Sequence, residues 1–386
     1  MPRSHDAIVV GAGPAGSTCA YRLASAGASV LLLDRARFPR DKPCGGGVTM
    51  RAARLLPFRL DPVVEDVVDR VRLRLRYGRS FERGGREPLV LMTQRKRLDH
   101  YLVERAVEVG AEFRDGAKVT GVDGTAALLG DERVEAATLV GSDGVNGISA
   151  RALGLGGNRE VGVALEGNVP YGKLADGYRG SLVLEIGVAP GGYGWVFPKG
   201  SHANVGIGGW GREGPRLRER LARLCAAHGI ADEDLEDLRG YRLPCRAPGS
   251  SLARGRALVV GDAAGLVDPL SGDGMYEAFL SAKLAAEAVL DVLAGRTDTV
   301  EAYEERLNAR LARHLWAAWS VKGALERFPR TAFALSRTGI VWRAVERVVR
   351  GELSDVTEVR GLARPPLKAL ALLARAAGDP GRGFRS

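Results

Sequence analysis

The sequence predicts an α/β protein in three parts: a first domain on a parallel sheet, a second domain on a β-sheet, and a helical C-terminal region. An apolar run over 5–10, an amphipathic helical pattern over 14–27 and a second apolar run over 28–34 form a β-α-β unit. Between about 162 and 241, strand-like runs alternate with glycine-rich turns, which is typical of a second sheet. From 299 to 378 the pattern is mostly helical.

The first domain is expected to be discontinuous. An amphipathic pattern over 95–110 and an apolar run over 257–261, followed by a helical pattern over 274–293, indicate that the chain returns to it twice. We therefore assign 1–76, 95–160 and 245–298 to the first domain, 77–94 and 161–244 to the second, and 299–386 to the helical region.

The composition is that of an ordinary globular protein, since 45% of the 386 residues are hydrophobic and 26% are charged. It excludes a disordered chain, a collagen and a disulfide scaffold. The four cysteines lack CxxC spacing and a nearby histidine, so we expect free thiols and no metal site. No secretory signal and no apolar stretch of the roughly 18–20 residues that span a bilayer are found, so we expect a cytoplasmic protein.

The positive charge gathers near the C-terminus. The chain has 56 basic and 46 acidic residues, a net charge of +10, and residues 296–385 hold 17 basic and 10 acidic ones, or +7. Such a region is typical of contact with an anionic membrane surface, a phosphorylated substrate or nucleic acid, and also of a helical cap in an arginine-rich proteome. Because the charge is not interleaved with aromatic side chains, we expect no nucleic-acid partner.

A glycine motif, Gly-Ala-Gly-Pro-Ala-Gly, stands between the first strand and the first helix at 11–16. Its glycines allow a tight turn and the approach of a pyrophosphate to the backbone at a helix N-terminus. Asp34 ends the second strand 18 residues after the last glycine, where an acidic residue binds ribose hydroxyls. These features predict dinucleotide binding, with expected contacts from Gly11, Gly13, Ala15, Gly16, Asp34 and Arg35.

A second motif specifies which dinucleotide. The segments 261–265 (Gly-Asp-Ala-Ala-Gly) and 269–275 (Pro-Leu-Ser-Gly-Asp-Gly-Met) resemble the second FAD fingerprint of the p-hydroxybenzoate-hydroxylase-like flavoproteins. The resemblance implies a Rossmann-like FAD-binding domain in which Asp262 contacts the ribityl chain, and Gly274 and Met275 face the flavin pyrimidine. Asp143, in Ser-Asp-Gly, resembles the same family's motif for FAD and NAD(P)H contacts, or lies in a plain turn.

Two further motifs resemble the geranylgeranyl reductase family of FAD-dependent oxidoreductases. Lys-Pro-Cys-Gly-Gly-Gly at 42–47 is similar to that family's loop against the flavin, and Tyr-Gly-Trp-Val-Phe-Pro at 193–198, followed by Gly-Ile-Gly at 206–208, is similar to its substrate-cavity motif. The resemblance extends over about 7–289. It implies flavin contacts from Cys44, Gly45 and Gly47, and substrate contacts from Tyr193, Trp195, Phe197, Pro198, Gly206 and Gly208.

Three other residues receive a role from the resemblance. Arg95 aligns with the family's FAD-contacting arginine, with Arg97 as the less suitable neighbour, and Val119 stands where the family offers backbone contacts to the adenine. Cys44 is the expected catalytic residue, either as a small polarizable side chain packed on the flavin or as a thiol that helps to protonate a reduced alkene carbon.

The resemblance implies a reductase that uses reduced FAD to saturate double bonds in a polyprenyl chain of a lipid, a quinone or a diphosphate. NADPH or ferredoxin is the expected electron donor, and such a substrate favours contact with an anionic cytoplasmic membrane surface. The alternatives are an aromatic or polyketide monooxygenase, a halogenase, and a non-catalytic flavin electron carrier. Halogenation is less favoured, because Tyr193 and Phe197 replace the Trp and Ile of the halogenase motif WxWxIP.

Overall fold

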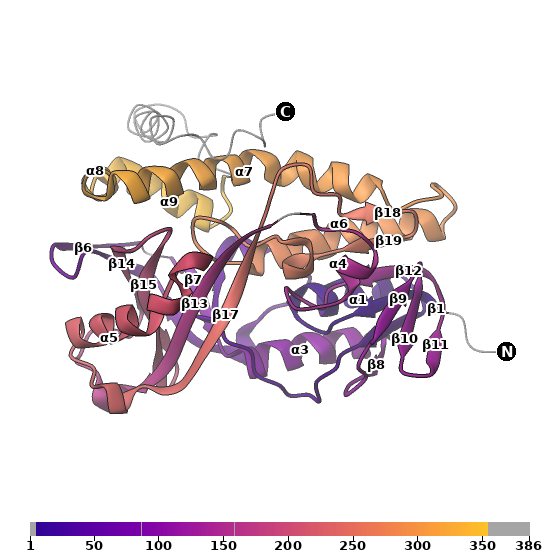
Figure 1. The fold of residues 1–386 in the computed structure, drawn as a ribbon, viewed down its shortest axis with the longest axis horizontal. Helices are drawn as coiled ribbons and strands as arrows, with labels where there is room; N and C mark the ends of the chain where they lie inside the picture. Colours follow the sequence, from indigo (N-terminus) through magenta and orange to yellow (C-terminus); the bar gives the residue numbers. More distant parts are fainter. Residues whose placement is uncertain (1–4, 86, 158, 354–386) are drawn as a thin grey trace.

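The computed structural model describes residues 5–85, 87–157 and 159–353. Figure 1 shows two sheet-based parts next to each other, with the long helix α7 (Ala302–Arg327) running across one side of both. The α/β fold class predicted from the sequence is confirmed, with a helical region after the second sheet.

Within the described ranges, six strands form the sheet of the first part. Strand β1 lies in the middle and pairs in parallel with β12 on one side and β2 on the other, so that Ala7 faces both Thr138 and Val30. Only the edge strand β18 pairs antiparallel among these described strands. In order across the sheet the strands are β18 (Ala253–Arg254), β19 (Ala257–Val259), β12 (Ala136–Gly141), β1 (His5–Val10), β2 (Val30–Leu33) and β8 (Glu112–Arg114).

Helices cover this sheet because its central strands are apolar on both faces. Leu31, Leu32 and Leu33 are fully buried, as are Ile8 and Val9. Helix α1 (Pro14–Ser25) packs between α3 (Arg95–Glu108) and α6 (Met275–Leu293), and α7 covers α6. The predicted β-α-β unit is therefore present, and strands β12 and β19 and helices α3 and α6 from later in the chain lie with it.

The second part is a sheet of seven strands within the described ranges. Helix α5 (Leu217–Ala227) covers one face and buries Leu217, Leu221 and Leu224 against it. The long strands β13 and β17 run side by side toward the first part (Figure 1). In order the strands are β17 (Glu236–Arg246), β13 (Arg159–Pro170), β16 (His202–Trp210), β15 (Gly192–Lys199), β14 (Ser181–Ala189), β5 (Arg70–Leu75) and β6 (Ser80–Gly84).

Strand β5 corrects one predicted domain boundary. We assigned 1–76 to the first domain, but 70–75 pairs in parallel with β14 of the second sheet. The pairing partner lies more than a hundred residues away, so local periodicity gives no sign of it.

Smaller elements complete the described chain. Strand β7 joins β3 and β4 in a small sheet, and β9 to β11 form another. The strands are β3 (Gly47–Thr49), β4 (Val64–Val68), β7 (Val90–Thr93), β9 (Gly121–Asp123), β10 (Ala126–Leu129) and β11 (Glu132–Val134). The remaining helices are α2 (Met50–Ala53), α4 (Ser149–Ala152), α8 (Pro329–Ser336), α9 (Gly339–Val349) and the 3₁₀ turns Asp61–Val63, Tyr171–Lys173, Gly211–Arg216, Asp232–Asp234 and Gly261–Ala264.

The helical C-terminal region is confirmed up to residue 353, and the predicted helix beyond that position lies outside the described residues. Within the described part of the chain, none of the helices combines the length and apolar character needed to cross a membrane.

Candidate FAD and substrate site

The first glycine motif forms a tight turn between β1 and α1. Gly11 has a φ of 103°, and a Cβ on Gly16 would lie 1.8 Å from the Gly11 carbonyl oxygen. A Cβ on Gly13 would have no described heavy atom nearer than Arg40 Nη2, at 3.7 Å. Gly11 and Gly16 therefore make the turn possible, whereas Gly13 leaves open the side where a pyrophosphate would approach.

Asp34 lies at the end of β2, next to this turn. Its carboxylate accepts hydrogen bonds from Ala12 N at 2.8 Å and Ala36 N at 2.9 Å. The adjacent Arg35 is exposed. Arg40, which the sequence did not single out, lies 3.9 Å from Asp34 and so brings a guanidinium beside Gly13. The signal that could have revealed it is the concentration of basic residues in the loop after β2.

The second motif contacts the first. A Cβ on Gly261, which has a φ of 55°, would lie 3.0 Å from the Ala15 Cβ. Asp262 Oδ2 accepts from Lys42 Nζ at 2.9 Å, and a Cβ on Gly274 would lie 3.3 Å from Asp262 Oδ1. The structure therefore brings the residues of both predicted fingerprints together at one edge of the first sheet.

Two cations keep Asp262 ionised. Burial alone would raise the pKa of Asp262, but Lys42 and Arg95 hold that pKa below its ordinary value. Tyr241 Oη also donates to Asp262 Oδ2, at 3.3 Å. An ionised carboxylate at this position can accept hydrogen bonds from hydroxyl groups, which is the role predicted for Asp262.

Two side chains of the second sheet hold the Cys-Gly loop by hydrogen bonds to its backbone. Cys44 N donates to Glu166 Oε1 at 2.6 Å, and Lys199 Nζ donates to the Cys44 carbonyl oxygen at 2.5 Å. Glu166 and Lys199 are both buried, and neither was predicted from the sequence. In the sequence, each of them is a charged residue next to apolar strand residues. This pattern marks both as unusual, but it does not show that they contact Cys44.

The two reductase-like motifs meet at this loop. A Cβ on Gly45 would lie 2.9 Å from the Phe197 ring, and Gly47 begins β3 directly after the loop. Tyr193, Trp195 and Phe197 alternate along β15, and the centroids of neighbouring rings are 6.0 and 6.1 Å apart. We call these three side chains the aromatic row.

Trp195 lies flat on β16 because of two glycines. A Cβ on Gly206 would lie 2.2 Å from the indole, and one on Gly208 would lie 3.7 Å from it. The indole nitrogen donates to Asn204 Oδ1 at 2.8 Å, and only 7% of Trp195 is exposed. The Gly-Ile-Gly pattern therefore makes room for this indole.

The structure contradicts the predicted substrate contact of Pro198. Side chains alternate along a strand, so Pro198 shares the face of Val196, which packs in the core beneath α5. The aromatic row occupies the opposite face. The motif holds residues of both faces, and only alternate positions can line one cavity.

Arg95 is buried at the start of α3. Its Nε and Nη2 atoms donate to the two carboxylate oxygens of Asp99, each at 2.7 Å. Arg97 instead points outward and donates to Glu65. Arg95 is therefore buried and Arg97 is not, whereas the predicted contact of Arg95 with FAD stays a prediction.

Asp143 and Val119 both lie outside helices and strands, and the predicted FAD contacts of both stay predictions. Asp143 Oδ2 accepts from Ile148 N, Ser149 N and Ser149 Oγ at 2.7–2.9 Å, so this oxygen stabilises the start of α4. Its Oδ1 is buried without a hydrogen-bond partner among the described residues. Val119 lies in the irregular link between β8 and β9, not on a strand.

Two cavities border this site. The larger, of about 710 Å³, is lined by β13, β17, the 3₁₀ turn before α5, the start of α5 and Asn146, and it includes Arg218 and Arg242 among apolar side chains. The smaller, of about 30 Å³, lies beside Lys42, Glu166 and Lys199. The aromatic row lines neither of these two cavities, so its predicted role in substrate contact stays a prediction.

Thiol labelling tests the environment of Cys44. Burial raises the pKa of Cys19 and of Cys245 to about 12 and that of Cys225 to about 11, whereas Cys44 is partly exposed. We expect the native protein to show one fast-reacting thiol with a disulfide reagent at pH 8, and unfolded protein to show all four. Cys44→Ser should remove the fast reaction and Cys225→Ser should keep it. A fast thiol that persists in Cys44→Ser contradicts the assignment.

The described residues fit FAD. The open side of Gly13 provides a cradle that a Cβ would fill, Arg40 supplies a cation beside it, and Asp262 offers an ionised acceptor. Helix α6 begins just beyond Gly274 and directs its N-terminus to the same edge of the sheet. These features define the class of protein as a dinucleotide-binding flavoprotein.

A family model described as an FAD binding domain matches residues 4–316. The chain therefore belongs to the FAD-binding-domain family of flavoproteins. Among curated proteins, it is 30% identical over 347 residues to the chloroplastic geranylgeranyl diphosphate reductase of Oryza sativa subsp. japonica, covering 83% of this chain and 74% of that one. It is 32% identical over 329 residues to digeranylgeranylglycerophospholipid reductase 1 of Methanopyrus kandleri, covering 79% and 85%. The chain is thus a member of the geranylgeranyl reductase family of FAD-dependent oxidoreductases.

Solved structures share the fold. A geranylgeranyl bacteriochlorophyll reductase-like protein from Thermoplasma acidophilum superposes with a TM-score of 0.80 at 22% identity, covering 97% of this chain and 100% of that one. A variant of a flavin-dependent brominase superposes with a TM-score of 0.76 at 19% identity, covering 96% and 98%. At these identities both show the fold alone, so the brominase gives no support to halogenation.

Proposed function

We propose that the protein is an FAD-dependent reductase that saturates double bonds of a polyprenyl chain. The observation that carries the proposal is the contact between the Cys-Gly loop and the aromatic row, since a Cβ on Gly45 would lie 2.9 Å from Phe197. The two relatives at 30% and 32% identity are named as reductases of geranylgeranyl-bearing molecules. One name gives a diphosphate and the other a phospholipid, and the proposal covers both of these and the quinone expected from the sequence.

Several residues would hold the FAD. Gly13 and Arg40 would receive the pyrophosphate, Asp34 the ribose, Asp262 the ribityl chain, and the N-terminus of α6 the pyrimidine. When bound and reduced, FAD supplies the hydride that a double bond accepts.

The chain itself must place the alkene, exclude water and deliver a proton. The aromatic row offers an apolar surface of tilted rings next to the Cys-Gly loop, on which a prenyl chain can rest without loss of hydrogen bonds. Glu166 and Lys199 fix the backbone of Cys44 from both sides, and Cys44 Sγ accepts from Gly46 N at 3.4 Å. We assign Cys44 as the catalytic residue that holds the proton for the alkene carbon.

The electron donor and the membrane contact are further parts of the proposal. NADPH or ferredoxin would reduce the FAD, and reduction of the flavin absorbance by each donor alone under anaerobic conditions separates them. The charge of +7 over 296–385 supports contact with an anionic membrane surface. Sedimentation with phosphatidylglycerol vesicles, but not with phosphatidylcholine vesicles, is the result expected from that contact.

The main test is anaerobic turnover. The purified protein is reduced with dithionite and mixed with geranylgeranyl diphosphate, menaquinone or a geranylgeranyl ether lipid, and the product mass is followed. A gain of about two mass units per reduced bond supports the proposal. If every prenyl substrate stays unchanged, while oxygen leads to a hydroxylated product, the monooxygenase alternative replaces it.

Glu166 is expected to act as a positioning residue for Cys44. Glu166→Ala removes the acceptor of Cys44 N and leaves the buried Lys199 without this anion, so the loop should shift. A shift of about 1 Å can cost on the order of 10²-fold in turnover. We expect that loss in kcat with FAD content unchanged, and recovery to within about tenfold in Glu166→Gln, which keeps an acceptor oxygen. Glu160→Ala, exposed on the same strand, is the control, and equal turnover in all variants would refute the role.

A further inference from the structure

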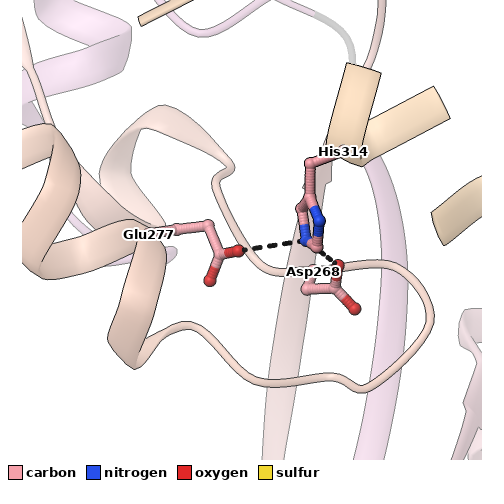
Figure 2. A group of neighbouring side chains, drawn as sticks. All are labelled: Asp268, Glu277 and His314. Atoms are coloured by element: carbon pink, nitrogen blue, oxygen red, sulfur yellow. Dashed lines mark hydrogen bonds and ion pairs between the residues drawn. The ribbon is translucent and has the colours of Figure 1, made fainter. Parts of the chain in front are cut away.

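Three polar side chains from separate elements converge beneath the second fingerprint. Asp268 belongs to the loop that leads into α6, Glu277 to the first turn of α6, and His314 to the middle of α7. Figure 2 shows all three pointing toward one another, with the imidazole of His314 between the two carboxylates. One ligand atom from each lies within 4.8 Å of the others.

Glu277 is the unusual member of this cluster. Its side chain is fully buried, and both carboxylate oxygens have no hydrogen-bond partner among the described residues. A buried carboxylate without a hydrogen bond is rare, and an unseen ion or water is a standard explanation. The cationic groups that lie within 4.0 Å of Glu277 Oε1 among the described residues are His314 Nε2, at 3.7 Å, and Arg51 Nη2, at 3.9 Å.

The other two side chains are already oriented. Asp268 Oδ1 accepts from Leu270 N, Ser271 N and Ser271 Oγ at 2.7–3.0 Å, which leaves Oδ2 directed at His314 Nε2, 2.9 Å away. Hydrogen bonds of this kind, from outside the ligand set, orient carboxylate ligands in metal sites.

We propose that Asp268 Oδ2, Glu277 Oε1 and His314 Nε2 bind a divalent transition-metal ion such as Zn²⁺ or Mn²⁺. Imidazole together with carboxylates suits these ions, whereas Mg²⁺ and Ca²⁺ prefer oxygen ligands alone. Bonds of about 2.0–2.2 Å place two ligand atoms of a tetrahedral site about 3.4 Å apart. The separations of 2.9 and 3.7 Å from His314 Nε2 bracket that value, and the two carboxylates lie within 4.8 Å of each other.

The neighbouring cations do not occupy the site. Arg51 lies beyond hydrogen-bond distance from Glu277 and stacks over the Tyr276 ring at 4.2 Å. Lys322, near Asp268, donates instead to the carbonyl oxygens of Pro269 and Gly191. A bound ion would crosslink the loop over 268–274 to α6 and α7. It would thereby fix the position of the backbone that leads to Gly274.

The sequence predicts no metal site, because the ligands are separated by 8 and 36 residues in the chain and follow none of the familiar spacings. The proposal is independent of the substrate. A failure of the reductase assay therefore says nothing about the ion, and a failure to bind the ion says nothing about turnover.

The experiment uses the full-length, FAD-loaded protein after removal of any affinity tag. The protein is treated with EDTA, incubated with millimolar ZnCl₂ or MnCl₂, and passed through a desalting column before the metal content per chain is measured. We expect one ion per chain in the wild type, almost none in Glu277→Gln and His314→Gln, and one in the control His100→Gln. His100 is the matched control because it pairs with Glu104 on the exposed surface of α3.

A second measurement does not depend on the folding of the variants. With Mn²⁺ bound to the wild type, pulsed electron paramagnetic resonance should detect coupling to one imidazole nitrogen. A wild type that retains no ion and shows no nitrogen coupling overturns the proposal, and Glu277 then holds a proton instead. Equal metal content in the wild type, Glu277→Gln and His314→Gln overturns it as well, because the ion then binds elsewhere.

Discussion

Gly13→Ala is expected to abolish tight FAD binding while the protein stays folded. Gly13 has a φ of −79° and a ψ of −175°, which any residue adopts, and its Cβ would approach nothing closer than the flexible end of Arg40 at 3.7 Å. The methyl group would occupy the space where a pyrophosphate meets the backbone. Loss of one hydrogen bond to a charged group costs about 1.5–3 kcal/mol, which corresponds to about a 10- to 150-fold weaker affinity.

The measurement is titration of the apoprotein with FAD, followed by quenching of the flavin fluorescence, together with the Tm of the apoprotein. Gly172→Ala is the neutral control, since its Cβ would have no described heavy atom within 4 Å. Gly16→Ala is the contrasting variant, because its Cβ would overlap the Gly11 carbonyl and should lower the Tm as well as the affinity. An affinity of Gly13→Ala equal to that of the wild type would show that the cofactor does not pass over this turn.

These glycines also show how much of the site could be predicted from the sequence. The strand, the turn, the helix and the acidic residue of the first motif stand within thirty residues, so their spacing alone predicts their geometry. Asp262 and Gly274 are also close in the chain, and the structure places them in contact. Local motifs of this kind carry their own structural context.

The hydrogen bonds that hold the backbone of Cys44 could not be predicted in the same way. Glu166 and Lys199 come from β13 and β15, and reach Cys44 only because the second sheet packs against the loop. A single sequence gives no sign of pairing across 122 or 155 residues. The same limit explains why β5 was assigned to the wrong domain.

Asp143 illustrates a different limit. An aspartate followed by glycine is compatible with a cofactor contact and with the start of a helix, because both roles use a carboxylate that accepts backbone N–H groups. In the structure Asp143 Oδ2 serves α4. The motif alone cannot reveal the contacts of Oδ2, since they are with residues 148 and 149, and with Oδ1 unpartnered among the described residues the predicted cofactor contact stays a prediction.

Asp99→Ala is expected to destabilise the protein more than any other single change considered. Asp99 is fully buried and accepts from Arg95 Nε, Arg95 Nη2 and Arg40 Nη1, each at 2.7 Å. Its removal leaves the guanidinium of Arg95, which is 4% exposed, without its counter-ion. Breaking a buried ion pair by removing one partner costs about 3–5 kcal/mol, because the remaining charge stays desolvated.

Urea unfolding of the apoprotein measures this loss, with Asp123→Ala as the control. Asp123 also pairs with an arginine, Arg133, but its side chain is 70% exposed, so its removal should cost at most about 1 kcal/mol. The double variant Arg95→Met with Asp99→Leu distinguishes two contributions to this loss. One is the missing attraction between Arg95 and Asp99, and the other is the cost of a buried Arg95 charge without a counter-ion. Because the double variant leaves no charge at position 95, it should be more stable than Asp99→Ala, even though it also lacks the ion pair. If the double variant is instead less stable than Asp99→Ala, packing around the pair, and not the unpaired guanidinium, determines the loss.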